Sequence, residues 1–362
     1  MDLNKIKRRK FLGLGAAAIA GLAFPNFIIK KPQKKLGVAL LGLGLYSRGQ
    51  LAPALTMTKH CYLAGIITGS PEKIPVWQKK YRISDGNIYS YSNMHQIENN
   101  DSIDVIYVVT PTGTHADFVL RAADTGKHIW CEKPMAMNVA ECKKMINACI
   151  NNRVKLTLGY RVQHEPNTQI VNSYTQVLPF NRINKIDAAA GYYGGGGTGW
   201  RFQKEMGGGA LYDMGVYTVN GMRRALNLEP IKVLSARQYS NRAHLFREVD
   251  ETTEYSILFK NGILGSGKTS VGESINHLKV DCEEGWYELR PMQTYSGVRG
   301  RRSDGQLIDD YLPNQQAKQM DDDAYSILNN QRLLIDPIEG LKDIGVIEAI
   351  VRSAKSGKPI GL

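Results

Sequence analysis

The segment on which the fold depends is Leu36-Gly37-Val38-Ala39-Leu40-Leu41-Gly42-Leu43-Gly44-Leu45-Tyr46-Ser47. Its first six residues, apolar apart from one glycine, are typical of a parallel strand that is covered on both faces. The glycines form a turn, and a helix-like segment follows as far as Met57. Because glycines let a backbone approach a pyrophosphate, this order of elements predicts a dinucleotide site. An ordinary tight turn is the alternative, since Ser47 stands where the usual pattern has a third glycine.

The same alternation of strand and helix continues to about residue 159. Apolar strands are predicted at 62–68, 103–110, 128–131 and 155–159, and helices at 114–125 and 138–150. Alternating strands and helices indicate βαβ units. We therefore expect an α/β chain that begins with a Rossmann parallel sheet over residues 35–158.

The pattern changes after residue 160. Helices are predicted at 167–178 and 209–226, a glycine-rich loop at 191–199, and strands at 184–190, 231–239, 252–259, 263–270, 277–282 and 286–289. Asn261-Gly262 between two of these strands is a strong hairpin signal. We expect residues 159–335 to form an α+β domain with a large, mostly antiparallel open sheet.

Two further expectations follow for this half of the chain. A strong helix at 338–355 is predicted to pack back on the first domain, within a C-terminal segment of residues 336–362. The open sheet would leave one face for a partner subunit, so we expect a homodimer or homotetramer built through it.

The net charge of +12 comes mostly from the first 35 residues, which hold nine lysines and arginines against Asp2 alone. The rest of the chain is close to balanced, so nucleic acid is not an expected partner. Lys7-Arg8-Arg9-Lys10 precedes a short apolar run from Leu14 to Phe24. This arrangement predicts a twin-arginine-like signal and linker over residues 1–30 and a periplasmic protein.

The apolar run of the leader is too short to cross a bilayer comfortably, so no stable membrane span is expected in the mature protein. The five cysteines form no pair with the spacing of a metal site. We therefore predict neither a disulfide framework nor a bound metal.

The stretch Trp130-Cys131-Glu132-Lys133-Pro134 places a lysine directly after a short apolar strand. The carboxyl end of a parallel strand faces the crevice in which an open α/β sheet binds its ligand. An ammonium at this place can act on a substrate hydroxyl beside a nicotinamide ring. Lys133 is accordingly a candidate catalytic residue, and Glu132 and Lys133 are candidate cofactor contacts.

The end of the second strand bears on the choice of cofactor. An acid is usual there in NAD enzymes, where it accepts hydrogen bonds from the ribose. This chain has Thr68-Gly69-Ser70-Pro71-Glu72-Lys73. Hydroxyls and an ammonium attract the 2′-phosphate of NADP, so NADP is predicted and NAD is the alternative. If the segment is aligned differently with the usual pattern, Glu72 could be the acid that accepts hydrogen bonds from the ribose.

The third strand ends in Thr110-Pro111, and His115 opens the next helix. All three are predicted cofactor contacts. His115 would lie near the nicotinamide, although a histidine in the first turn of a helix is more often structural.

A second group of polar residues follows the triple glycine 207–209. Asp213, Tyr217 and Asn220 recur at helical spacing, so they share one face. Their neighbours are apolar, which predicts that much of this helix is buried. Buried polar groups need partners, and a sugar can supply them.

Together these motifs resemble the glucose–fructose oxidoreductase, inositol dehydrogenase and MocA-like family across most of residues 36–360. The residues that carry the resemblance are Gly42-Leu43-Gly44, Thr68-Gly69 with Lys73, Glu132-Lys133-Pro134-Met135-Ala136, Gly159-Tyr160-Arg161, Trp200-Arg201, and Gly207-Gly208-Gly209 through Tyr217. Tyr217 stands where many members have a histidine and where glucose–fructose oxidoreductases have a tyrosine.

The resemblance implies a role for each position. Lys133 would polarise the reacting hydroxyl, Tyr217 would be the acid and base, and Asp213 would bind a neighbouring hydroxyl. The cofactor would contact Gly42, Leu43, Gly44, Tyr46, Ser47, Thr68, Gly69, Ser70, Lys73, Thr110, Pro111, His115, Glu132, Lys133 and Arg161. The substrate would contact Tyr160, Arg161, Trp200, Arg201, Asp213 and Tyr217. An ammonium lowers the pKa of a nearby phenol, and a cationic ring lowers that of a nearby amine.

The resulting expectation is an NADP-dependent sugar oxidoreductase that moves a hydride between nicotinamide and a carbon of a pyranose or polyol. The chain lacks the long proline-rich arm that follows the leader in glucose–fructose oxidoreductase, so permanent NADP retention is not implied. One alternative is a glycosidase that works by C3 oxidation and elimination with the same cofactor. Another is a non-catalytic dinucleotide-binding protein.

Overall fold

The computed structural model describes residues 34–194 and 199–362. The predicted leader over residues 1–30 and the middle of the glycine-rich loop therefore lie outside the described residues. Within the described ranges no helix combines the length and the apolar character that crossing a membrane requires.

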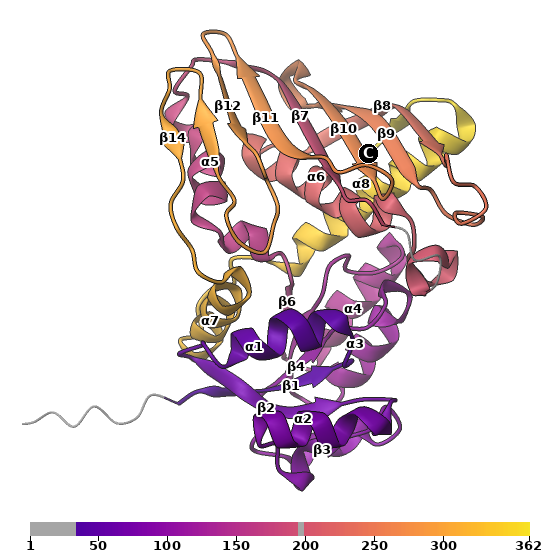
Figure 1. Ribbon diagram of the computed structural model, residues 1–362, viewed down its shortest axis with the longest axis vertical. Coiled ribbons are helices and arrows are strands. Elements are labelled where there is room, and N and C mark those ends of the chain that lie inside the picture. The colour runs from indigo at the N-terminus through magenta and orange to yellow at the C-terminus, as the bar shows by residue number, and fades with distance from the viewer. Residues whose placement is uncertain (1–33, 195–198) are drawn as a thin grey trace, which may run out of the picture. The chain divides into compact units, whose positions relative to one another are not determined.

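The first domain is the predicted Rossmann sheet (Figure 1). Its strands are β1 (Leu36–Leu41), β2 (Cys61–Ile67), β3 (Ile88–Tyr89), β4 (Val105–Val108), β5 (His128–Cys131) and β6 (Leu156–Leu158). They lie in the order β3-β2-β1-β4-β5-β6, and every neighbouring pair is parallel. The helices are α1 (Ala52–Leu55), α2 (Ile74–Tyr81), α3 (His115–Ala123) and α4 (Val139–Asn151).

Strand β1 lies at the centre of this sheet because it has no polar face. All six residues are buried, with β2 on one side and β4 on the other. The strand order reverses between β1 and β4, and ligands of open parallel sheets bind at such a reversal. The predicted glycine turn follows β1 at this point.

The second domain is built on a nine-stranded sheet of order β14-β13-β12-β11-β7-β10-β9-β8-β15. Its strands are β7 (Ile183–Gly191), β8 (Pro230–Tyr239), β9 (Thr252–Phe259), β10 (Leu264–Ser270), β11 (Asn276–Cys282), β12 (Trp286–Leu289), β13 (Gly300–Arg302), β14 (Leu307–Ile308) and β15 (Ile360–Gly361). Only the β7–β10 pair is parallel among these strands. This confirms the predicted α+β domain with a mostly antiparallel sheet.

The remaining helices are α5 (Pro166–Val177), α6 (Ala210–Leu226), α7 (Gln315–Leu328) and α8 (Pro337–Ser356). Short helices are η1 (Ser47–Leu51), η2 (Pro71–Lys73), η3 (Asp85–Asn87), η4 (Met94–Asn99), η5 (Thr112–Thr114), η6 (Arg161–His164), η7 (Trp200–Phe202), η8 (Lys204–Met206) and η9 (Lys260–Gly262). Helix η1 is a π-helix and the others are 3₁₀ helices.

The predicted hairpin at Asn261-Gly262 joins β9 to β10. Both residues have positive φ, 67° and 79°, as a tight hairpin of this kind requires. The backbone N–H of Phe259 donates to the carbonyl of Ile263 at 2.9 Å and closes the turn. Local turn chemistry alone therefore sets the register of this pair.

The two C-terminal helices of the chain both contact the first domain, and only one of them was predicted. Helix α7 was not predicted, and it packs on α1, η1 and β2 of the first domain (Figure 1). Helix α8 was predicted over 338–355, and it contacts α4 and β6 of the first domain together with α6 and β8 of the second. Strand β15 then pairs with β8, so the last residues complete the second sheet.

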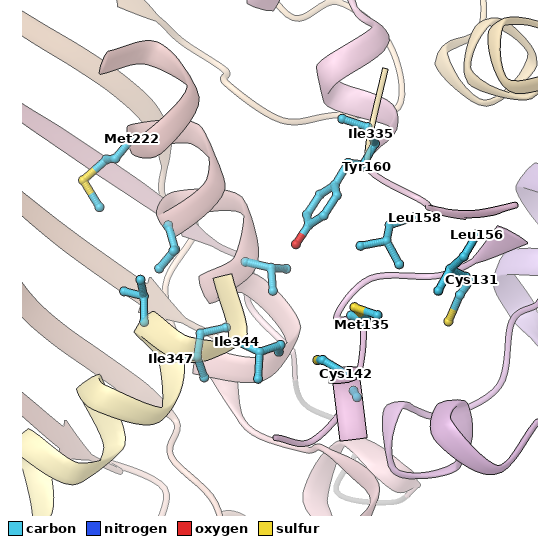
Figure 2. Packing of buried hydrophobic residues seen from close by; sticks show 14 of the residues in the cluster. Cys131, Met135, Cys142, Leu156, Leu158, Tyr160, Met222, Ile335, Ile344 and Ile347 are labelled. Atoms are coloured by element: carbon cyan, nitrogen blue, oxygen red, sulfur yellow. The ribbon is translucent and has the colours of Figure 1, made fainter. Parts of the chain in front are cut away.

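One continuous apolar core runs from the first sheet to the second. Figure 2 shows part of it, with Cys131, Met135, Leu156 and Leu158 of the first domain across from Ile344 of α8. Because the two domains share this core, their facing surfaces are held in one arrangement.

A buried ionic cluster fixes α6 against α8 inside that core. The Arg223 guanidinium pairs with the Asp343 carboxylate, and both side chains are almost fully buried. Asp343 also accepts hydrogen bonds from Tyr160 Oη at 2.6 Å and from Asn220 Nδ2 at 2.8 Å. Removing one member of a buried ion pair leaves an uncompensated charge, which costs far more than an exposed pair contributes.

We therefore expect Asp343→Ala to lower the free energy of unfolding by about 3–5 kcal/mol, as measured by urea titration. Lys342→Ala is the matched control, because Lys342 pairs with Glu229 where both side chains are exposed by about two fifths. That variant should lose less than about 1 kcal/mol. Similar losses in the two variants would contradict the role given to the buried pair.

Candidate active site

The candidate site lies where the carboxyl ends of the first sheet meet α6 of the second domain. Strand β5 ends at Cys131, and the backbone N–H of Glu132 donates to Val108 at 2.9 Å. This bond extends the β4–β5 ladder by one residue. Lys133 therefore leaves the sheet in a fixed direction.

Helix α6 supplies the other half of the site from its first turns. It begins after Gly209, whose φ of +95° suits a glycine. Asp250 satisfies the two following backbone N–H groups, since its carbonyl accepts from Ala210 at 3.0 Å and its carboxylate from Leu211 at 2.9 Å. Sequence reasoning missed Asp250, because it lies about 40 residues from the helix that it caps.

The ammonium of Lys133 lies against both candidate residues of α6. Its Nζ donates to the carbonyl oxygen of Asp213 at 2.9 Å and lies 3.7 Å from the Asp213 carboxylate. The same Nζ is 4.6 Å from the centroid of the Tyr217 ring. Three residues predicted from two separate motifs thus meet in one place.

The charges on Lys133, Asp213 and Arg201 affect the pKa values of their neighbours. Burial opposes the ionisation of Asp213, but Lys133 and Arg201 outweigh it and hold the pKa of the carboxyl below its usual value. Burial also opposes the charge on Lys133, but Tyr217 and Asp213 outweigh it and raise the pKa of the amine. At neutral pH the site therefore holds an ammonium beside a carboxylate.

Asp213 has further partners on the side away from Lys133. Arg201 Nε pairs with its Oδ2 at 3.0 Å, and the Tyr192 hydroxyl donates to the same oxygen at 2.9 Å. Trp200 does not bond to Asp213, but the Arg201 guanidinium lies 4.5 Å from its ring centroid. Tyr192 was not predicted, since it stands beside a glycine-rich stretch without a recognisable motif.

Arg161, the first residue of η6, lies close to Tyr217. Its guanidinium carbon lies 5.7 Å from the Tyr217 ring centroid and 4.8 Å from that of Tyr295. Its Nη1 donates to the Thr294 carbonyl at 2.6 Å and to the Gln315 side chain. Arg161 is thus a buried cation within the predicted site, and Tyr295 and Gln315 are neighbours that sequence reasoning missed.

The glycine turn after β1 has the geometry that close approach of a ligand requires. Gly42 has φ of +99°, and a Cβ there would lie 2.7 Å from the Val109 carbonyl. A Cβ at Gly44 would meet nothing within 4 Å, so the space above this residue is open. Ser47 Oγ donates to the Gly42 carbonyl at 2.5 Å, which ties the turn to η1.

Other residues of the turn lie in different surroundings. Leu43 is buried in the core, whereas Tyr46 lies beside Tyr295 with ring centroids 6.0 Å apart. Burial raises the pKa of the Tyr46 phenol well above its usual value. Tyr46 thus connects the turn to the Arg161 side of the site.

The residues after β2 form a separate polar turn. The Ser70 backbone N–H donates to Thr68 Oγ1 at 3.0 Å, so Thr68 shapes this turn. A Cβ on Gly69 would meet the ring of Tyr91. Lys73 is exposed, and within the described ranges it forms no ion pair. This ammonium is free to meet an anion.

The residues after β4 contact the segment that holds Lys133 through the ring of His115. His115 is buried, with Nδ1 2.9 Å from the Pro134 carbonyl and Nε2 2.8 Å from the Thr110 carbonyl. Its ring therefore links Thr110 to the residue after Lys133. The expectation that His115 binds the cofactor is not what this geometry favours, because both ring nitrogens already face the backbone. Pro111 precedes η5 at the same edge.

The predicted substrate contact of Tyr160 needs correction. Its ring is part of the shared core (Figure 2), and its hydroxyl donates to Asp343 rather than facing Asp213. Only 2% of this residue is exposed. Tyr160 and Arg161 are consecutive, but the first bonds to Asp343 and the second to Thr294 and Gln315.

Among the described residues, no group of three or more histidines, cysteines, aspartates or glutamates is arranged to hold a metal ion. The polar groups of the site are instead those that bind a hydroxylated ligand and a dinucleotide. Glycine backbone, hydroxyls and cations fit such a cofactor.

Family models match both halves of the chain. One described as the oxidoreductase family with an NAD-binding Rossmann fold covers residues 36–160, and one described as the GFO/IDH/MocA C-terminal domain covers residues 180–288. Among curated proteins, D-xylose 1-dehydrogenase [NADP(+)] of Haloarcula marismortui is 23% identical over 336 residues, which are 90% of this chain and 92% of that protein.

Solved structures match over most of the chain. The aldose-aldose oxidoreductase of Caulobacter crescentus, crystallised with glycerol, has 32% identity and a TM-score of 0.87, over 91% of this chain and all of that one. The scyllo-inositol dehydrogenase of Lactobacillus casei has 16% identity and a TM-score of 0.75, over 91% and 99% of the two chains. At this identity, the similarity to scyllo-inositol dehydrogenase shows a shared fold and no more.

The open space above Gly44 gives a direct test of cofactor binding. In Gly44→Ala the added methyl group would leave the fold intact but meet an approaching pyrophosphate. We expect the Kd for NADP to rise at least about tenfold, with the melting temperature unchanged. Fluorescence titration measures the first quantity and calorimetry the second.

Gly49→Ala is the matched control, because a Cβ at Gly49 also meets nothing within 4 Å. It should change neither quantity. If Gly44→Ala binds NADP as tightly as the unaltered protein, the turn is not the pyrophosphate site.

Proposed function

We propose that this chain, which belongs to the glucose–fructose oxidoreductase, inositol dehydrogenase and MocA family of NAD(P)-dependent oxidoreductases, is an NADP-dependent sugar oxidoreductase. It would interconvert a CH–OH group and a carbonyl on a pyranose or polyol carbon. The observation that carries the proposal is the meeting of Lys133, Asp213 and Tyr217 beside the glycine turn. When bound, the nicotinamide supplies the hydride acceptor or donor.

Lys133 would bind the reacting hydroxyl, and Tyr217 would exchange a proton with it. The ammonium, which is 4.6 Å from the Tyr217 ring, donates a hydrogen bond to the reacting oxygen and stabilises negative charge on it. The Tyr217 hydroxyl exchanges the proton with that oxygen as general acid and base.

Asp213 would hold the sugar by a neighbouring hydroxyl. Its carboxylate stays ionised because Lys133 and Arg201 flank it. A carboxylate accepts hydrogen bonds from sugar hydroxyls, while Arg201 and Tyr192 fix its orientation. The relatives named for aldoses and xylose support an aldose as the substrate class.

The first prediction concerns Lys133. In Lys133→Met the ammonium is lost while much of the side-chain volume remains, so kcat should fall by about 10²–10⁴-fold. NADP binding should change much less. The measurement is steady-state reduction of NADP by D-xylose and D-glucose, with nucleotide affinity determined separately.

Lys143→Met on the exposed face of α4 is the control, and it should keep full activity. A Lys133→Met protein with undiminished turnover would refute the catalytic assignment. Loss of activity together with unfolding would be detected by circular dichroism and would point to a structural role instead.

The second prediction concerns the cofactor. Lys73 is an exposed ammonium without an ion-pair partner among the described residues, and we propose that it meets the 2′-phosphate of NADP. Lys73→Ala should weaken NADP binding about tenfold and leave NAD binding unchanged, whereas Lys79→Ala should alter neither. Equal loss for both nucleotides would exclude contact with the 2′-phosphate.

A third experiment distinguishes a two-sugar cycle from a simple dehydrogenase and from a non-catalytic binding protein. The purified protein is analysed for bound nucleotide, and its nicotinamide absorbance is followed while an aldose and then a ketose are added. Formation of reduced nucleotide by one class and reoxidation by the other would indicate a two-sugar cycle. A requirement for added NADP would indicate a simple dehydrogenase, and absence of any change would favour a non-catalytic binding protein.

A further inference from the structure

A series of buried polar groups extends from the active site through the first domain to the surface. It begins at Glu132, next to Lys133, and it involves the face of α7 that packs against the first domain. The groups along it are Glu132, Tyr107, Gln319, Asp323, His164 and Asp322. All but Asp322 are buried.

The first links are direct hydrogen bonds. The Tyr107 hydroxyl donates to Glu132 Oε1 at 2.6 Å, and Gln319 Nε2 donates to the Tyr107 oxygen at 3.3 Å. Glu132 belongs to the electrostatic environment of the site, because its charge raises the pKa of Lys133. A proton held at Glu132 would therefore change the charge that Lys133 experiences.

The middle of the series contains polar atoms that lack partners. Gln319 Oε1, Asp323 Oδ2 and His164 Nε2 are buried, and none has a hydrogen-bond partner among the described residues. Asp323 is fully buried, and its Oδ1 lies at a long distance of 3.5 Å from Thr157 Oγ1. Buried polar atoms without protein partners are commonly satisfied by ordered water, which also conducts protons.

The outer end reaches solvent through a histidine. His164 Nδ1 lies 2.9 Å from Asp322 Oδ2, and about a third of the Asp322 side chain is exposed. The His164 side chain itself is fully buried, with its Nε2 unpaired on the inner side. An imidazole can take up a proton on one nitrogen and release another from the second.

We propose that Tyr107, Gln319, Asp323, His164 and Asp322, with water between the unpaired atoms, form a path that carries protons between Glu132 and the surface. The inference rests on the proposed function, because only an oxidation or reduction of a hydroxyl produces or consumes a proton at this site. The amide of Gln319 positions the hydroxyl of Tyr107 and the water, while Asp323 and His164 accept and release the proton.

The chemistry balances without a further reactant. When CH–OH becomes C=O, the C–H bond delivers a hydride with two electrons to the cofactor, and the O–H bond releases one proton to the side chains. That proton passes from Tyr217 and Lys133 to Glu132, and each later carrier gains one proton as it loses one. In the direction of reduction the same groups carry a proton inward.

The surroundings of Asp323 suit a carrier. Burial raises the pKa of its carboxyl to about 7, with the charge of His164 lowering it and that of Asp322 raising it. Cys61 faces it from β2 and Thr157 from β6. The acid is thus protonated below about pH 7 and ionised above it, so both forms are present at neutral pH.

The test compares hydride transfer with proton release in one turnover. Protein loaded with NADP is mixed with D-xylose or D-glucose in weak buffer containing a pH indicator dye. Nucleotide reduction and dye absorbance are followed together by stopped flow. In Asp323→Asn we expect proton release to lag hydride transfer by about tenfold or more, with a larger solvent isotope effect on kcat.

Glu165→Gln is the control, because Glu165 is also buried and carboxylic but its oxygens accept hydrogen bonds from Asn167 and Thr168 rather than from a residue of the path. Its proton release should stay coincident with hydride transfer. His164→Gln is a second variant, and added imidazole should restore its proton release. Coincident release in both Asp323→Asn and His164→Gln would overturn the path, whereas absence of hydride transfer in the unaltered protein would overturn the proposed function instead.

A second readout does not depend on turnover. Infrared difference spectra of the protein between pH 5 and pH 9 should contain a carboxylic-acid band that disappears around neutral pH. The band should be absent in Asp323→Asn and retained in Glu165→Gln. An unchanged band in Asp323→Asn would show that Asp323 does not titrate there, and the proposed carrier would be excluded.

Discussion

The structure depends on one carboxylate that lies between two cations. The ammonium of Lys133 reaches Asp213 from the first domain, and Arg201 approaches the same carboxylate from the other side. Charges that leave water are costly unless they are paired and hydrogen-bonded. The two domains supply opposite charges to one place, so the candidate site requires both of them. The hydroxyl of Tyr192 completes the coordination of the carboxylate.

This constraint explains why the candidate site lies between the domains rather than within one. The Rossmann sheet alone offers a lysine at a strand end and an open glycine turn, but no group that selects a hydroxylated ligand. Helix α6 alone offers Asp213 and Tyr217 without a cofactor. The shared core around Met135 and Ile344 holds them in register, and the buried pair of Arg223 with Asp343 fixes α6 against α8.

Much of the fold and part of the site were predictable from the sequence. Strand β1, the glycine turn, the hairpin at Asn261-Gly262 and the meeting of Lys133 with Tyr217 follow from local patterns or a family resemblance. Helix α7 was not predictable from apolar spacing, because Gln319 and Asp323 occupy its buried face. Only Asn314, whose side chain caps its first turn, gave a local signal. The role predicted for Tyr160 did not take account of its buried hydrogen bond to Asp343, a residue 183 positions away in the chain.

The position of α7 also bears on how the chain is made. Ala317, Met320 and Ala324 belong to the apolar cluster around β1 and β2, although some 250 residues separate them from those strands in the chain. During synthesis the first domain therefore leaves the ribosome before the helix that covers its β1–β2 side. Its apolar cluster stays incomplete until almost the whole chain has been made. Contacts of such long range slow folding, and here they tie the stability of the first domain to a late segment of the chain. The two halves should therefore acquire their stability together.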